Sequence, residues 1–246
     1  GGYAVLIRKF DPDQVLDVIQ QQQVDTLPAV ENMLIQLTES PSFMAEKLKS
    51  VKIIYTGGAA CSPDSMEPYW SLGIPVVQSY GLTEAGPSNF LFYPFHTDLE
   101  TVRQNNHGVG WPMFHCDYKL IDQNDGSDID PASGKPGIIC LRSLGNFSGY
   151  LDDDEKTRNI LTEDGWIISG DIGYFNEDGI FYVLGRADNM FISGGENIQP
   201  EEVELILERH PAVLKATCVS MASERWGRIP LAEVILTTEY EATETE

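Results

Sequence analysis

The chain has 246 residues, 42% of them hydrophobic, which is enough to bury a core in one large domain or two smaller ones. Its 38 acidic residues outnumber 16 basic ones, and the net charge of -22 disfavours binding to nucleic acid or to an anionic membrane. An anionic substrate would have to be met locally, by helix N-termini, backbone amides, a single arginine or a metal ion.

The four cysteines, Cys61, Cys116, Cys140 and Cys218, are scattered and form no C-x-x-C pair. This pattern predicts buried, reduced thiols, and neither a zinc site nor a disulfide framework. There is no secretory signal and no apolar run of about 18 residues, so we expect no membrane span and a cytoplasmic location. Nothing in the sequence indicates the oligomeric state.

The first hundred residues alternate helices and short buried strands. Asp11 and Pro12 are typical of an N-cap and a first helical position, and apolar spacing then predicts a helix to about Gln23. A second helix is expected over residues 30–37, and β-rich runs over 51–55 and 74–79 end at glycine turns.

This alternation predicts a parallel α/β sheet, in which ligands bind at the carboxyl ends of the strands. The turns at Gly57-Gly58 and at Tyr80-Gly81 follow the two predicted strands. They are therefore candidate site loops.

From about Gly108 the pattern changes to short strands and polar turns, which predicts a β-rich subdomain. Its strands are expected over residues 118–121, 137–142 and 166–168, with a hairpin across 176–179. An α+β unit follows, with a strand at 190–192, a loop at 193–197, a helix from Pro200, and strands near 214–220 and 231–236. The predicted division is 1–107, 108–187 and 188–246, and the acidic stretch 237–246 is expected to be a surface segment or a cut edge.

Five consecutive residues after the second strand combine groups that nucleotide chemistry uses. The Tyr80 ring can stack on a base, and Gly81 lets the backbone approach a phosphate. Thr83 offers a hydroxyl to a phosphate oxygen, and Glu84 offers a carboxylate to Mg²⁺. Such a turn by itself is more often structural than catalytic, and the same holds for Gly57-Gly58-Ala59.

Further motifs follow in a fixed order: Gly149-Tyr150-Leu151, Ser169-Gly170-Asp171, Gly185-Arg186-Ala187-Asp188, Gly194-Gly195-Glu196-Asn197-Ile198 and Pro200-Glu201-Glu202-Val203-Glu204. With this set the chain resembles the adenylate-forming superfamily of acyl-CoA synthetases, aryl-CoA ligases, luciferases and peptide-synthetase adenylation domains. The matches run from Gly1 to about Leu236. The resemblance implies part of an α/β AMP-binding domain with a β-barrel-like subdomain, followed by a partial α+β C-terminal domain.

The resemblance also implies a nucleotide site. Gly57-Gly58-Ala59 would line the adenine site, and Tyr80 would pack against the base, with Gly81 beside the nucleotide. Thr83 would contact phosphate and Glu84 would help hold Mg²⁺, which makes these two the implied catalytic residues.

Four further roles come from the same resemblance. Asp171 would accept hydrogen bonds from both ribose hydroxyls, and Arg186 would reach the ribose or the phosphates. Asp188 matches the hinge between the large and the small domain. The Ser193-Gly194-Gly195 loop matches the one that approaches the thiol channel. The structural alternatives are a β-turn aspartate, a surface arginine, a linker aspartate and a tight turn before the Pro200 helix.

Two family elements are absent from the sequence. It has no Ser/Thr/Gly-rich loop ending in Lys-Gly, which in the family cradles the ATP phosphates. It also has no Pro-then-Gly-Lys motif near the C-terminus, and its last lysine is Lys215, on a predicted strand. We therefore expect a fragment cut at both ends, which by itself does not form an acyl-adenylate.

The leading interpretation is an ATP-dependent acid–thiol ligase, which forms an acyl-adenylate from a carboxylic acid and then an acyl-CoA thioester. ATP/AMP, Mg²⁺ and CoA would be its cofactors, and the motif from Gly194 to Pro200 favours the CoA ligases. The alternatives are an adenylation domain that loads a carrier protein and a non-catalytic nucleotide-binding remnant. The implied pocket walls near residues 30–34, 78–80 and 85–88 are small or apolar, which favours an aliphatic (fatty) or aromatic acid over a charged amino acid.

Overall fold

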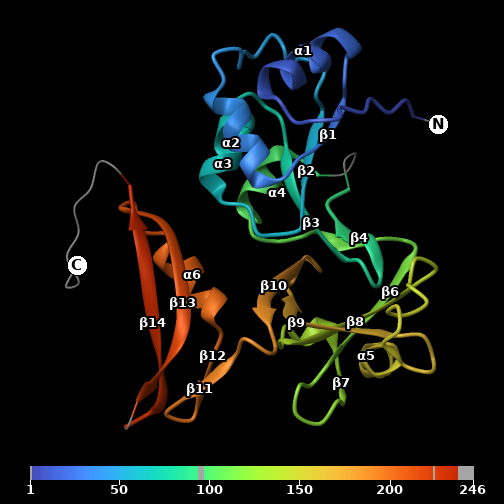
Figure 1. Cartoon of the computed structure of the whole chain (residues 1–246), viewed down its shortest axis with the longest axis vertical. Coiled ribbons are helices and arrows are strands. Elements are labelled where there is room, and N and C mark those ends of the chain that lie inside the picture. Colours follow the sequence, from blue (N-terminus) through green and yellow to red (C-terminus); the bar gives the residue numbers. More distant parts are fainter. Residues whose placement is uncertain (1, 94–96, 224, 238–246) are drawn as a thin grey trace. The chain divides into compact units, whose positions relative to one another are not determined.

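A computed structural model describes residues 2–93, 97–223 and 225–237 (Figure 1). The chain divides into two compact units. One comprises Gly1–Tyr118, Leu141–Ile167 and Asn176–Tyr182, and the other comprises Lys119–Cys140, Ile168–Phe175 and Val183–Glu246. The division at residues 107 and 187 that the sequence suggests stays a prediction. Within the described ranges, no helix is both long enough and apolar enough to span a bilayer.

The first sheet has the strand order β1-β2-β3-β4-β5. Its first three strands, β1 (Thr26–Pro28), β2 (Ile53–Thr56) and β3 (Val76–Leu82), are parallel, with Leu27 opposite Ile54 and Ile54 opposite Val76. The parallel α/β pairing that the sequence predicts is therefore confirmed for these strands. β4 (Gly86–Leu91) and β5 (Trp111–Pro112) extend the sheet in the antiparallel sense.

Helices α1 (Pro12–Gln22) and α2 (Glu31–Glu39) confirm the two predicted helices to within two residues. α3 (Pro63–Trp70) and α4 (Leu99–Gln104) complete the helices of this part of the chain. The apolar faces of α1, α2 and α3 join β2 and β3 in one core. The polar groups of two buried aromatic residues of α3 form hydrogen bonds in this core. The Tyr69 hydroxyl donates to the Leu34 carbonyl at 2.9 Å, and the Trp70 indole donates to the Val76 carbonyl at 3.2 Å.

The second five-stranded sheet has the order β10-β9-β8-β6-β7. Its strands are β6 (Cys116–Ile121), β7 (Asp128–Ile129), β8 (Gly137–Ser143), β9 (Ile167–Phe175) and β10 (Phe181–Arg186). The predicted turn between β9 and β10 is confirmed, with the Gly179 amide donating to the Asn176 carbonyl at 3.0 Å. β9 is much longer than the predicted strand over 166–168, because it continues through two glycines. A single 3-10 turn (Pro131–Ser133) and the helix α5 (Asp154–Ile160) were not expected from the sequence.

The C-terminal elements are two hairpins and a helix. β11 (Phe191–Ser193) pairs with β12 (Glu196–Ile198), and the long strands β13 (Val213–Ser223) and β14 (Gly227–Leu236) pair with Val219 opposite Leu231. α6 (Pro200–Leu207) lies against β13 (Figure 1). Glu204 of α6 accepts a hydrogen bond from the Cys218 amide of β13 at 2.7 Å. The predicted surface segment from residue 238 onward lies outside the described residues.

All four cysteines are free and buried, as their scatter in the sequence predicts. Burial raises the pKa of each thiol, and that of Cys140 to about 11. The thiols therefore stay protonated at neutral pH and pack as small apolar groups.

The N-cap of α1 allows a test of local helix stability. Asp11 accepts a hydrogen bond from the Gln14 amide at 2.9 Å, and Pro12 occupies the first helical position. Asp11→Ala should lower the free energy of unfolding by about 1 kcal/mol, because an orphan amide loses its acceptor. Asp11→Asn keeps a good cap and should cost less than half of that. Equal losses for the two variants in urea unfolding would contradict the capping role.

Candidate functional site

The predicted loop at Gly57-Gly58 follows β2 and lies beside β3, directly after the last parallel pair of the two strands, Thr56 with Gln78. The Ser79 hydroxyl donates to the Thr56 carbonyl at 3.0 Å. A Cβ atom on Gly57 would lie only 2.7 Å from the Ser79 hydroxyl, so glycine is needed for this close approach. Gly58 has a φ of 86°, and both Gly58 and Ala59 are exposed, which leaves their backbone accessible to a ligand.

Tyr80 lies on an aromatic platform. Its ring centroid is 6.0 Å from that of Phe90 and 5.9 Å from that of Phe181. Phe90 and Phe181 are fully buried and stack on each other at 4.8 Å. Because two packed rings hold it from behind, the half-buried Tyr80 ring has a fixed orientation. This suits a side chain that stacks on a planar ligand.

Thr83 and Glu84 lie at the tip of the β3–β4 hairpin. The sequence predicts a strand end at Tyr80-Gly81, and this is wrong, because β3 continues to Leu82, which pairs with Gly86. Between the pairs Tyr80–Phe90 and Leu82–Gly86, β4 has two more residues than β3, so the irregularity lies in β4, where Ser88 has a φ of 59°. Gly81 lies inside β3 and not in a turn after it. The hairpin thus carries the exposed Thr83 and the half-buried Glu84 beyond the last strand pair.

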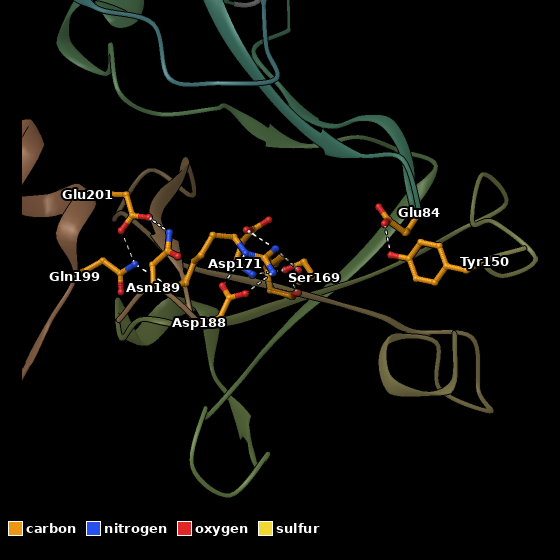
Figure 2. Close-up of polar contacts among 10 residues, drawn as sticks. Glu84, Tyr150, Ser169, Asp171, Asp188, Asn189, Gln199 and Glu201 are labelled. Carbon is orange, nitrogen blue, oxygen red and sulfur yellow. Dashed lines mark hydrogen bonds and ion pairs between the residues drawn. The ribbon is translucent and has the colours of Figure 1, made fainter. Parts of the chain in front are cut away.

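The Glu84 carboxylate has one oxygen that is open to a ligand such as Mg²⁺. Its Oε1 atom accepts a hydrogen bond from the Tyr150 hydroxyl (Figure 2), and its Oε2 atom has no hydrogen bond to any described residue. The described residues contain no cluster of three His, Cys, Asp or Glu side chains that could hold a metal. A single carboxylate with an open oxygen fits Mg²⁺, which takes most of its ligands from phosphates and water. The assignment of Mg²⁺ to Glu84 stays a prediction.

Arg186 is the centre of a second polar cluster, and its partners Ser169, Asp171 and Asp188 are labelled in Figure 2. Its Nη1 atom lies 3.2 Å from Asp171 Oδ1 and donates to the Ser169 carbonyl at 2.9 Å. Its Nε atom lies 3.1 Å from Asp188 Oδ1. The guanidinium thus connects the predicted ribose ligand, Asp171, to the predicted hinge residue, Asp188.

The Ser169-Gly170-Asp171 segment of β9 is built to receive this guanidinium. The buried Ser169 hydroxyl donates to the Ile139 carbonyl at 2.7 Å and accepts from the Asp171 amide at 3.0 Å. Gly170 has a φ of 75°, and a Cβ atom there would lie 2.9 Å from Arg186 Nη2. The backbone conformation therefore favours glycine, and a side chain there would have to displace the Arg186 guanidinium.

The ion pair between Arg186 and Asp188 shifts the pKa of both groups. The hydrogen bond from Arg186 lowers the pKa of Asp188, and the same bond raises the pKa of Arg186. The Asp188 side chain is 71% exposed and the Asp171 side chain 17%, so solvent weakens the Asp188 pair more than the Asp171 pair.

A separate set of hydrogen bonds holds the residues on both sides of Asp188. The side-chain amide of Gln199 donates to the Arg186 carbonyl at 2.9 Å and to Glu201 Oε2 at 2.8 Å. The side-chain amide of Asn189 donates to Glu201 Oε1 at 2.7 Å (Figure 2). Residues at the start of α6 thus hold the predicted hinge in this conformation.

The predicted thiol-channel loop forms the tip of the β11–β12 hairpin. Ser193 pairs with Glu196, and Gly194 and Gly195 make the turn, both with positive φ. The Gly194 amide donates to the Trp226 carbonyl at 3.1 Å, and a Cβ atom on Gly194 would lie 2.6 Å from the Trp226 ring. The half-exposed indole therefore packs directly on the glycine turn.

The predicted residues thus form two groups, each within one unit: positions 57–59 and 80–84 in one, and Asp171, Arg186, Asp188 and the 193–195 turn in the other. The sequence assigned no role to Tyr150, Gln199 or Glu201, although it singled out the motifs around Tyr150 and Glu201. The contact between Tyr150 and Glu84 joins positions 66 residues apart, and no local pattern predicts it.

The AMP-binding enzyme family matches residues 1–151, which is more than half of the chain. The chain belongs to this family. The expected membership of the adenylate-forming superfamily and the expected α/β fold class are confirmed. The domain boundaries and the site residues stay predictions.

This AMP-binding enzyme is similar to 4-coumarate–CoA ligase 3 of Oryza sativa subsp. japonica, with 30% identity over 100% of this chain and 44% of that protein. It is also similar to the feruloyl-CoA synthase of an Amycolatopsis species, with 33% identity over 96% of this chain and 46% of that protein. Among solved structures, the amide bond synthetase McbA from Marinactinospora thermotolerans has a TM-score of 0.85 and 28% identity, over 99% of this chain and 48% of that chain. The chain thus spans about half the length of these relatives.

The ion pair of Asp188 can be tested by titration of this AMP-binding enzyme. In Arg186→Gln the pKa of Asp188 should rise toward its usual value of 3.8, measured from the Asp188 carboxyl ¹³C shift by NMR. Because the folded-state pKa lies below the unfolded one, Asp188 stabilises the fold above about pH 4 and loses this contribution as the pH falls through its folded-state pKa. In Arg186→Gln, this contribution to the free energy of unfolding, and its loss at low pH, should be absent.

Asp98 provides an internal control for this titration. Its pKa is lowered by the Thr101 amide at the N-cap of α4, with no arginine involved, and should not move in Arg186→Gln. An Asp188 pKa that stays equally low without the guanidinium would contradict the pairing.

Proposed function

We propose that the protein is an ATP-dependent acid–CoA ligase, which activates a carboxylic acid as its acyl-adenylate and then transfers the acyl group to the CoA thiol. The observation that carries the proposal is the similarity to CoA ligases over nearly the whole chain, 30% to 33% identical. The two polar groups described above supply residue types that suit this chemistry.

Each predicted site residue has a part in the proposed reaction. The Gly57-Gly58-Ala59 turn would line the adenine site and the supported Tyr80 ring would pack on the base. Thr83 and Glu84 would meet the phosphates, with Mg²⁺ at Glu84 supplying positive charge where the transition state gathers negative charge. Arg186 is held by two carboxylates and would exchange part of these contacts for the nucleotide, whose negative charge its guanidinium would stabilise.

The proposed acid is aromatic. The named relatives act on 4-coumarate and feruloyl groups, and both of these carry a planar ring. The sequence also allowed a fatty acid, and the following assay tests both alternatives. Incubation of the full-length protein with ATP, Mg²⁺ and a panel of aryl, fatty and amino acids should give pyrophosphate exchange that is strongest with aryl acids.

A second candidate differs only in the nucleophile. The similarity to an amide bond synthetase favours an amine as the acceptor of the acyl group in place of a thiol. Supplying the acyl-adenylate with CoA, with simple amines or with a phosphopantetheinyl carrier protein separates the three outcomes. We expect the thioester with CoA, because the Gly194-Gly195 turn with its packed Trp226 suits the thiol-channel loop of the CoA ligases.

Asp171 is the residue whose loss should weaken nucleotide binding most directly. In the full-length protein, Asp171→Ala should raise the dissociation constant of ATP by about tenfold or more, because the ribose loses charge-assisted hydrogen bonds of about 1.5–3 kcal/mol each. Isothermal titration with ATP measures this change. Asp128→Ala removes an exposed aspartate of the same unit, paired with Lys119, and should leave the affinity unchanged. If the two variants bound ATP with the same affinity, Asp171 would not be part of the nucleotide site.

Asp188 tests whether the domains must reorient between the two half-reactions. Asp188→Pro fixes φ near about -65° and restricts Ala187, so it should trap one orientation. Pyrophosphate exchange should persist, whereas thioester formation from pre-made acyl-adenylate should fall by about a hundredfold or more.

The matched control for this variant is Asp188→Ala, which also loses the ion pair with Arg186 but keeps a flexible backbone. It should retain both half-reactions. A parallel loss of both half-reactions in Asp188→Pro alone would indicate local misfolding, and no change in either would make Asp188 an ordinary linker residue.

A further inference from the structure

The segment over residues 143–150 holds the hairpin tip that carries Thr83 and Glu84. The Ser143 hydroxyl donates to the Ala85 carbonyl at 3.1 Å, and the Phe147 amide donates to the Glu84 carbonyl at 2.8 Å. The Tyr150 hydroxyl donates to the Glu84 carboxylate itself (Figure 2). Two of these bonds fix the backbone of the tip, and the third fixes the functional side chain.

Tyr150 is in turn held by its own surroundings. Its amide donates to the Thr157 hydroxyl of α5 at 2.9 Å, and that hydroxyl donates to the Asp153 carbonyl at 2.9 Å. Gly149 has a φ of 140°, and a Cβ atom there would lie 3.0 Å from the Thr157 side chain. The motif Gly149-Tyr150 and the later Thr157 therefore act together to place one phenol.

Two neighbours also fix the Tyr150 ring. The Phe147 ring meets it edge to face at 5.0 Å, and the Lys156 ammonium lies 4.2 Å from the ring centroid. A ring that is held at its backbone, edge and face has little freedom to turn. Its hydroxyl is consequently a fixed donor for Glu84.

Because of the hydrogen bond from Tyr150, the two carboxylate oxygens of Glu84 have different surroundings. Oε1 is occupied by the phenol, whereas Oε2 has no hydrogen bond to the described part of the chain. A half-buried glutamate at a hairpin tip would otherwise sample several rotamers. Fixing the side chain before a ligand arrives removes that ordering cost from binding.

We infer that Tyr150 is a positioning residue, which orients Glu84 so that Oε2 is presented to the divalent cation of a metal–nucleotide complex. The inference deepens the proposed function and rests on it. It gives a role to the Gly149-Tyr150 motif and to α5, neither of which has a part in the ligase chemistry described above.

The test is the magnesium dependence of pyrophosphate exchange in the full-length protein. Tyr150→Phe removes only the hydroxyl and keeps the ring contacts with Phe147 and Lys156. We expect the Mg²⁺ concentration at half-maximal rate to rise about tenfold, the lower end of the cost of losing an outer partner of a metal ligand. The rate at saturating Mg²⁺ should stay within about twofold of the wild type.

Tyr93→Phe is the matched control, because the Tyr93 hydroxyl also makes one hydrogen bond, to the Pro112 carbonyl at 2.6 Å. It should leave the magnesium dependence unchanged. In a Glu84→Ala background, Tyr150→Phe should have no further effect, since a residue that acts through Glu84 has nothing left to orient. An effect of Tyr150→Phe that persists without Glu84, or one that Tyr93→Phe reproduces, would overturn the inference.

A measurement without catalysis separates this inference from the proposed function. In urea unfolding of the 246-residue chain, Tyr150→Phe and Glu84→Ala should couple by about tenfold in the unfolding equilibrium constant, and Tyr93→Phe and Glu84→Ala should not couple. If the full-length wild-type protein shows no pyrophosphate exchange with any acid, the proposed function fails. The unfolding measurement then tests the inference alone. If Tyr150→Phe and Glu84→Ala do not couple, the inference that Tyr150 orients Glu84 is wrong.

Discussion

The parallel pairing of β2 with β3 is the constraint from which the first group of site residues follows. Parallel strands bring their carboxyl ends to one edge, so the Gly57 turn after β2 comes directly beside Ser79 near the end of β3. The pairing tolerates this closeness only because Gly57 has no side chain. From there β3 runs on through Gly81 into a hairpin with β4, and the hairpin carries Thr83 and Glu84 at its tip.

Packing behind the loops determines how rigid the site is. Tyr80 is supported by Phe90 and Phe181, which come from β4 and β10, and Glu84 is supported by Tyr150, which precedes α5. In both cases an exposed or half-exposed functional group is held by buried or packed aromatic residues. A preorganised site of this kind binds its ligand with less loss of conformational entropy.

Arg186 shows how a chain of net charge -22 can use a single cation. Two carboxylates and one carbonyl surround the guanidinium, and Gly170 leaves room for it. The charge is thus concentrated at one place, where an anionic ligand could exchange contacts with Asp171 or Asp188. Gln199 and Glu201 fix the neighbouring backbone, so the same region combines an ion pair that can rearrange with a hydrogen-bonded anchor on α6.

Elements that depend on a local pattern of residues could be predicted from the sequence. The N-cap at Asp11, the end of β2 at the Gly57 turn, the β9–β10 turn and the Pro200 helix all follow from residue type and spacing, and so does the family resemblance. The contacts of Gly170 with Arg186 and of Tyr150 with Glu84 became apparent only in the folded structure. These contacts join residues 16 and 66 positions apart. Hydrogen bonds over such separations are fixed by strand order and packing, which no short-range periodicity encodes.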